Sequence, residues 1–122
     1  MTSPRPALAL SALLAVAGVT HFALPKPYDR MVPTTLPGSA RTWTYLSGVA
    51  ELAVAAAVVT PRTRQLGGLA AAALFTAVFP ANVKMAVDAR NRSRTERLAT
   101  VARLPLQVPL VIWALRVSRS AA

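Results

Sequence analysis

The segment Trp43–Thr60, with the sequence WTYLSGVAELAVAAAVVT, decides the fold because it is apolar and long enough to cross a lipid bilayer as one helix. It contains a single charged residue, Glu51, near its centre. A carboxylate at the middle of a membrane helix costs at least about 2.5 kcal/mol on insertion scales. Glu51 therefore needs a polar partner or a functional role. The polar residues in the other apolar segments indicate which of the two applies.

Three further segments of the chain are apolar over a similar length. A helix needs roughly 20 residues to cross a hydrocarbon core about 30 Å thick. The four segments are Ala7–Leu24, Trp43–Thr60, Leu66 to about Val87 and Val101–Val117, each 17 to 22 residues long. The sequence therefore predicts an all-α fold, in which residues 1–122 form one antiparallel four-helix transmembrane bundle. We expect a multi-pass protein of the cell membrane with both termini on the same side.

The composition favours the same class of protein. Hydrophobic residues make up 54% of the chain and charged residues only 15%, which is typical of a protein embedded in a lipid bilayer. The net charge is +10, but the basic residues lie at the ends of the apolar segments. That placement indicates contact with lipid head groups, so we predict no nucleic-acid partner.

The first apolar segment has a second interpretation. Arg5 and the Ala/Leu-rich run after it resemble the charged and apolar regions of a secretory signal peptide. The run continues through His21 without a well-placed small-x-small cleavage site. We therefore expect this segment to be the first transmembrane helix.

Proline predicts where helices end or break. The segment Pro25–Arg41 contains four prolines, a frequency that precludes a helix, so we expect a rigid, extended or capped loop over one face of the bundle. Pro80 lies in the third apolar segment, and Pro105 and Pro109 lie in the fourth. Each proline removes a backbone donor, so we expect interruptions in both of these helices.

Small residues predict where helices touch. The hydrophobic effect does not drive helices together within a lipid bilayer. Helix association there depends on small residues that let two backbones approach closely. Gly48 on the second segment and Gly68 on the third are suited to such contacts. The sequence therefore predicts a compact bundle.

Six polar residues fall in the same half of the bilayer. Successive spans alternate in direction, so the ends of the first and third helices lie on the same side as the starts of the second and fourth. The six residues are His21, Glu51, Asn82, Lys84, Arg103 and Gln107. The sequence therefore predicts a polar pocket that opens toward the first and third loops and lies under the proline-rich segment.

We assign two sets of residues to this pocket. Glu51, His21 and Arg103 are the candidate catalytic residues, and we expect Glu51 to pair with Arg103. The candidate ligand-binding residues are Trp43, Ser47, Phe79, Asn82 and Gln107. One histidine and one buried carboxylate fall short of the three protein ligands of a catalytic metal site, so we predict no metal.

Each of these polar residues also has a purely structural interpretation. His21 would then donate a hydrogen bond to a carbonyl at the end of its helix, and Lys84 and Arg103 would extend their charges to the membrane interface. Asn82 and Gln107 would then bridge helices or bond the backbone near the prolines. For Glu51 the corresponding alternative is an ion pair that only holds two helices together.

The chain resembles the DoxX-like family of small membrane proteins. The resemblance covers most of the chain and rests on four stretches: Gly18-Val-Thr-His-Phe followed by Pro25-x-x-Tyr28, Val32-Pro and Leu36-Pro; Tyr45-Leu-Ser-Gly-x-x-Glu51; Phe79-Pro-Ala-Asn82; and Arg103-Leu-Pro-Leu-Gln107. It implies a four-helix transmembrane fold and an association with redox assemblies. It also implies recurrent polar positions at His21, Glu51, Asn82, Arg103 and Gln107.

Two classes of function follow. In the first, the chain is an accessory subunit whose pocket holds a lipophilic molecule such as a quinone and serves redox partner proteins. His21, Asn82 and Gln107 would bond the carbonyl of that molecule. In the second, the chain is an isomerase or hydrolase that uses Glu51 as general acid and base, with Arg103 stabilising an oxyanion. A homodimer and a transport pathway stay open in either case.

Overall fold

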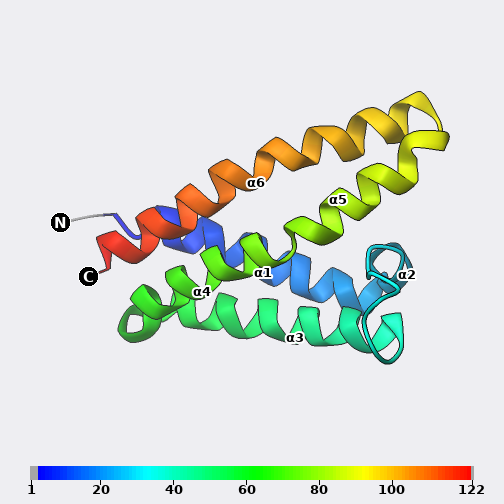
Figure 1. Ribbon diagram of the computed structural model, residues 1–122. Coiled ribbons are helices and arrows are strands. Elements are labelled where there is room, and N and C mark those ends of the chain that lie inside the picture. Colours follow the sequence, from blue (N-terminus) through cyan, green and yellow to red (C-terminus); the bar gives the residue numbers. More distant parts are fainter. Residues whose placement is uncertain (1–2, 122) are drawn as a thin grey trace.

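The computed structural model describes residues 3–121, which form an all-α four-helix bundle without a β-strand in that range (Figure 1). The elements are α1 (Arg5–Ala23), α2 (Pro25–Asp29), α3 (Ala40–Val59), the 3₁₀ turn η1 (Pro61–Thr63), α4 (Arg64–Ala77), α5 (Phe79–Asp88), the 3₁₀ turn η2 (Ala89–Asn91) and α6 (Arg94–Ser120). Helix α1 begins and α6 ends at the same end of the bundle, which we call the terminal end (Figure 1). The opposite end, which carries α2 and η2, is called the loop end. The predicted fold class is confirmed.

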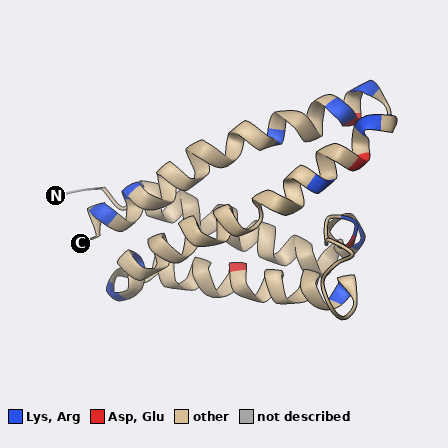
Figure 2. Ribbon diagram, viewed as in Figure 1, with Lys and Arg blue, Asp and Glu red and all other residues tan. Residues whose placement is uncertain are grey.

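Four helical stretches are long and apolar enough to cross a membrane: 5–23, 40–59, 61–91 and 94–120. Their outward faces carry large exposed hydrophobic side chains, among them Val16, Leu46 and Leu106. Basic residues gather toward the two ends of the bundle (Figure 2). This distribution is that of a multi-pass membrane protein, with apolar surface toward lipid and positive charge toward the head groups.

Two helices begin earlier than hydropathy predicts, because a serine caps each of them. Ser39 Oγ accepts a hydrogen bond of 3.2 Å from the backbone N–H of Thr42, so α3 begins at Ala40. Ser93 accepts a bond of the same length from Glu96 and starts α6 seven residues before the apolar segment. The first two turns of α6 are polar, so a hydropathy pattern misses them while a capping pattern does not.

Two expectations based on proline are wrong. Pro25 and Pro27 lie in the first turn of the short helix α2, where the backbone N–H groups have no intrahelical partner in any case. The proline-rich segment is therefore helical at its start. Pro105 and Pro109 lie inside α6 without ending it. They are spaced by one helical turn, so both missing donors fall on one face and the other faces keep their bonds.

The third span breaks as predicted. Helix α4 ends at Ala77, and α5 begins at Phe79 with Pro80 in its first turn. From this break α5 runs along α6 and away from α3 (Figure 1). The loop end is consequently splayed, and the break sets the width of the space between α3 and α5.

Close helix contacts at glycine residues hold the bundle together. A Cβ atom on Gly68 of α4 would lie 2.7 Å from the backbone nitrogen of Ser118 on α6. A Cβ on Gly48 of α3 would lie 2.9 Å from the His21 Cβ on α1. The predicted contacts of these two glycines are thus confirmed. Leu10, Leu14 and Val58 form the most deeply buried part of the core, toward the terminal end.

Candidate ligand-binding site

A cavity of about 440 Å³ lies beneath the proline-rich segment, between α1, α3 and the break that separates α4 from α5. We call it the roofed cavity. Its polar and aromatic lining consists of His21, Tyr28, Trp43, Thr44 and Ser47. Its apolar lining consists of Met31, Val32, Pro33, Leu36, Leu74, Ala77, Val78, Pro80 and Ala81. The cavity is thus mostly apolar, with a few polar groups on one side, as small-molecule sites usually are.

His21 lines this cavity from α1, and its ring is fixed by two contacts. Its Nδ1 is 2.7 Å from the carbonyl oxygen of Ala17, and because a carbonyl only accepts, Nδ1 donates this hydrogen bond. The ring of Tyr28 stacks on the imidazole, with centroids 3.7 Å apart. The hydroxyl of Thr20 donates to the same Ala17 carbonyl, so the Tyr28 hydroxyl donates to Thr20. The position of Nε2 is therefore well defined.

Nε2 of His21 faces Glu51, which lies one turn deeper than Ser47 on α3. Nε2 is 3.7 Å from Glu51 Oε1, and both side chains are buried. The second carboxyl oxygen, Oε2, is buried with no hydrogen-bond partner in the described part of the chain. A separation of 3.7 Å is longer than a hydrogen bond, and a small closure of the gap would let one proton rest on either group. The structure therefore places an acid and a base side by side, buried behind the cavity wall.

The approach of α1 to α3 explains this pairing. Gly48 precedes Glu51 by three residues and allows the two helices to come close beside His21. A side chain at position 48 would push against His21 and Phe22. The pairing of the carboxylate with the imidazole therefore depends on a glycine that makes no polar contact itself.

The roof of the cavity is bonded to both sides of the splayed end. On the α3 side, Asp29 accepts hydrogen bonds of 2.6 Å from Thr44 and 2.9 Å from Arg41. These bonds, led by that from Thr44, hold the pKa of Asp29 below its ordinary value of 3.8. On the α5 side, Lys84 Nζ donates to the Arg30 carbonyl at 3.0 Å. The segment that contains Asp29 and Arg30 is therefore tied down across the cavity.

The structure divides the predicted site into separate regions. Trp43 and Ser47 line the roofed cavity together with His21, whereas Phe79 and Gln107 line another hollow of about 300 Å³ between α4 and α6. Asn82 is buried on α5 and is absent from the lining of both spaces. The polar residues predicted to form one pocket therefore do not line one cavity.

The predicted pairing of Glu51 with Arg103 is wrong. The Arg103 side chain is exposed, and its Nη1 donates to Met85 Sδ at 3.5 Å. Helix α3 packs on α1, α2 and α4, whereas α6 packs on α4, α5 and, over a smaller area, α1. Glu51 consequently faces His21 on α1 and not Arg103 on α6.

Gln107 repairs the backbone, which is one of the structural interpretations given above. Its Nε2 donates to the carbonyl of Phe75, close to the break between α4 and α5. Lys84 also has a structural contact, because its Nζ is 2.6 Å from Asp88 in addition to the Arg30 carbonyl. Both residues thus support the shape of the splayed end.

Tyr28 and Thr44 are site residues that sequence reasoning missed. Tyr28 lies in the Pro25-x-x-Tyr28 stretch, and an aromatic residue a few positions after the histidine near the end of the first span was an available signal. Thr44 had no such signal, because hydroxyl residues are common inside membrane helices. Only the fold brings it to Asp29.

A family model described as a domain of unknown function, DUF8561, matches residues 10–118, so the chain belongs to that family. No curated protein and no solved structure matches the chain.

Proposed function

We propose that this protein binds a carbonyl-bearing lipophilic molecule, such as a quinone, in the roofed cavity and serves a membrane redox assembly. The observation that carries the proposal is the buried His21–Glu51 pair behind a mostly apolar cavity. A volume of about 440 Å³ lies within the range of small-molecule sites. The apolar lining suits a ligand that arrives from lipid.

The polar groups of the cavity lie on one side, which suits a flat ligand with a carbonyl at its edge. The Ser47 hydroxyl can donate to that carbonyl, and the Trp43 side chain lines the same space. Trp43 is itself positioned by a 2.7 Å hydrogen bond from its Nε1 to the Pro37 carbonyl. The ligand would therefore meet one preset aromatic side chain and one hydroxyl donor.

The His21–Glu51 pair gives this site a chemical use beyond binding. Reduction of a quinone to a quinol consumes two electrons and two protons, and the electrons would come from the partner protein. The His21–Glu51 pair lies behind the cavity wall and would supply one of these protons, and water at the loop end would supply the other. The resemblance to the DoxX-like family supports a redox setting of this kind.

A second candidate is a stand-alone isomerase or hydrolase that uses Glu51 as acid and base. The observation in its favour is the buried Oε2 of Glu51, which has no hydrogen-bond partner among the described residues. Against it, Arg103 is exposed and bonded to Met85, so it cannot serve Glu51 as an oxyanion stabiliser. Turnover of a lipophilic substrate by the purified chain alone would favour this candidate over the first.

The test is ligand-induced stabilisation of the purified full chain in detergent. A ligand that binds only the folded state at about 100 times its Kd adds roughly 2.7 kcal/mol of stability. We expect this gain with a short-chain quinone for the unaltered chain and a smaller gain for Ser47→Ala and Glu51→Gln.

Ser11→Ala is the matched control for Ser47→Ala. Ser11 is buried between α1 and α3, where its hydroxyl donates to the Ala55 carbonyl at 2.8 Å, and it does not line the cavity. This variant should lose some stability without ligand but keep the full gain from the quinone. No quinone gain in the unaltered chain, or equal gains in all variants, would refute the proposal.

A further inference from the structure

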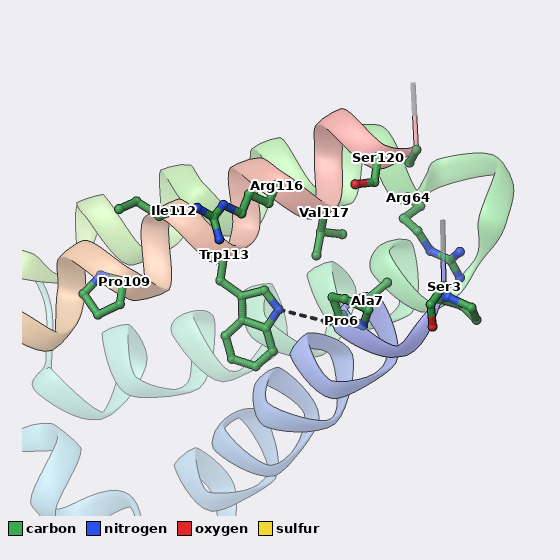
Figure 3. A pocket seen from close by; sticks show the side chains of 12 residues that line it. Ser3, Pro6, Ala7, Arg64, Pro109, Ile112, Trp113, Arg116, Val117 and Ser120 are labelled. Carbon is green, nitrogen blue, oxygen red and sulfur yellow. Dashed lines mark hydrogen bonds between the residues drawn. The ribbon is translucent and has the colours of Figure 1, made fainter. Parts of the chain in front are cut away.

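A second cavity, of about 490 Å³, lies at the terminal end, between the start of α1 and the last turns of α6 (Figure 3). We call it the terminal pocket. Its floor is apolar and includes Pro109, Ile112 and Val117, and its rim carries Arg64 and Arg116. It belongs to the opposite end of the bundle from the roofed cavity and has no part in the function proposed above.

From these features we infer that the terminal pocket binds an anionic phospholipid, with the phosphate held by arginine and an acyl chain on the apolar floor. A lipid is the fitting occupant because the pocket joins charge and apolar surface at the end of membrane-spanning helices. Basic pockets between such helices are where acidic lipid head groups bind.

The charge of the terminal end selects an anionic head group. Five arginines lie there, and no acidic residue does within residues 3–121; they are Arg5, Arg62, Arg64, Arg116 and Arg119. The acidic residues are Asp29, Asp88 and Glu96 at the loop end and Glu51 within α3, and Figure 2 shows this asymmetry. A phosphate bound here therefore meets positive potential without a competing carboxylate nearby.

The two rim arginines differ in their hydrogen bonds to the rest of the protein. Arg64 donates from Nε to the Val58 carbonyl at 2.8 Å and from Nη2 to the Val59 carbonyl at 3.0 Å, so it mainly caps α3. Arg116 is exposed, and Figure 3 shows its side chain lying along α6 toward Ile112, over the pocket. Arg116 is consequently the better-placed group for a lipid phosphate.

Trp113 gives the pocket an aromatic wall between α6 and α1. Its Nε1 donates to the Pro6 carbonyl at 3.0 Å, the contact that is dashed in Figure 3. Tryptophan is enriched at the membrane interface, because its ring is apolar and its N–H is polar. The fixed ring thus marks the depth at which a head group passes into its acyl chains.

The test compares lipids that differ only in the head group. The purified full chain in detergent is titrated with phosphatidylglycerol or with phosphatidylcholine of the same acyl chains, and bound lipid is counted by native mass spectrometry. We expect tighter binding of phosphatidylglycerol. Arg116→Gln should weaken that binding about tenfold, because it removes the charge-assisted hydrogen bonds from the guanidinium to the lipid phosphate.

Arg119→Gln is the matched control, since it removes the same charge from the same helix but does not line the pocket. It should leave phosphatidylglycerol binding within about twofold of the unaltered chain, and Arg116→Lys should keep most of it because the charge remains. Equal binding of the two lipids would overturn the inference. So would equal losses in Arg116→Gln and Arg119→Gln, or displacement of the lipid by inorganic phosphate, which would indicate a site for a free anion.

Discussion

The terminal and loop ends of the bundle are built on opposite principles. At the terminal end, Gly68 brings α4 against α6, and the core is filled by Leu10, Leu14 and Val58. At the loop end, the break near Pro80 directs α5 away from α3 and leaves a cavity under a bonded roof. Close packing in the terminal half thus supplies stability that lets the loop half stay open.

The largest effect should follow from filling a helix contact at the packed end. In Gly68→Ala the new Cβ would lie 2.7 Å from a backbone atom of α6, so the helices must move apart, and we expect a loss of about 3 kcal/mol. Gly38→Ala at the loop end is the control. A Cβ at position 38 would meet no other atom, and only the positive φ of 82° disfavours alanine there. We expect this substitution to lower the free energy of unfolding by about 1 kcal/mol. Unfolding in detergent measures both, and equal losses would contradict the comparison.

The next effect concerns which residues are coupled at the open end. We expect a double-mutant cycle of His21→Ala and Glu51→Gln to give a coupling of about 1 to 2 kcal/mol, because Nε2 and Oε1 are 3.7 Å apart in a buried setting. The corresponding cycle of Glu51→Gln and Arg103→Gln should be additive within about 0.5 kcal/mol. Coupling between Glu51 and Arg103 without coupling between His21 and Glu51 would contradict the structure and support the pairing predicted from the sequence.

A smaller effect is expected where α6 supports the break between α4 and α5. Gln107→Met keeps the size of the side chain but removes the hydrogen bond from Gln107 to the Phe75 carbonyl. We expect the free energy of unfolding to fall by about 1 kcal/mol. The stabilisation by a short-chain quinone should be unchanged, since Gln107 lies outside the roofed cavity. Loss of the quinone response in this variant would return Gln107 to the ligand site.

The smallest effect should be the pH dependence of the roof. The folded-state pKa of Asp29 is lowered, so its contribution is present above the ordinary value of 3.8 and is lost as the pH falls through the lowered value. A spin label at Thr34→Cys, in a chain without native cysteine, reports the mobility of the roof. It should become mobile on acidification in the unaltered chain and be mobile already at neutral pH in Asp29→Asn. A label that stays immobile in Asp29→Asn would show that other contacts hold the roof.

The sequence predicted the elements of this fold better than their ends. Hydropathy found all four spans and Pro80 marked the break in the third, because both signals are local. The early start of α6 depends on the Ser93 cap before a polar turn, which hydropathy does not register. The continuity of α6 through Pro105 shows that a proline in a membrane helix does not by itself end it.

By itself, the sequence determined where each polar group lies along its helix, and therefore which end of the bundle it is nearer to. Only the tertiary structure decided which of those groups meet. Which groups meet depends on how each helix is rotated and which helix lies beside it, and Gly48 brings α1 against α3. Glu51 therefore faces His21, and Arg103, on a helix that packs elsewhere, does not reach it.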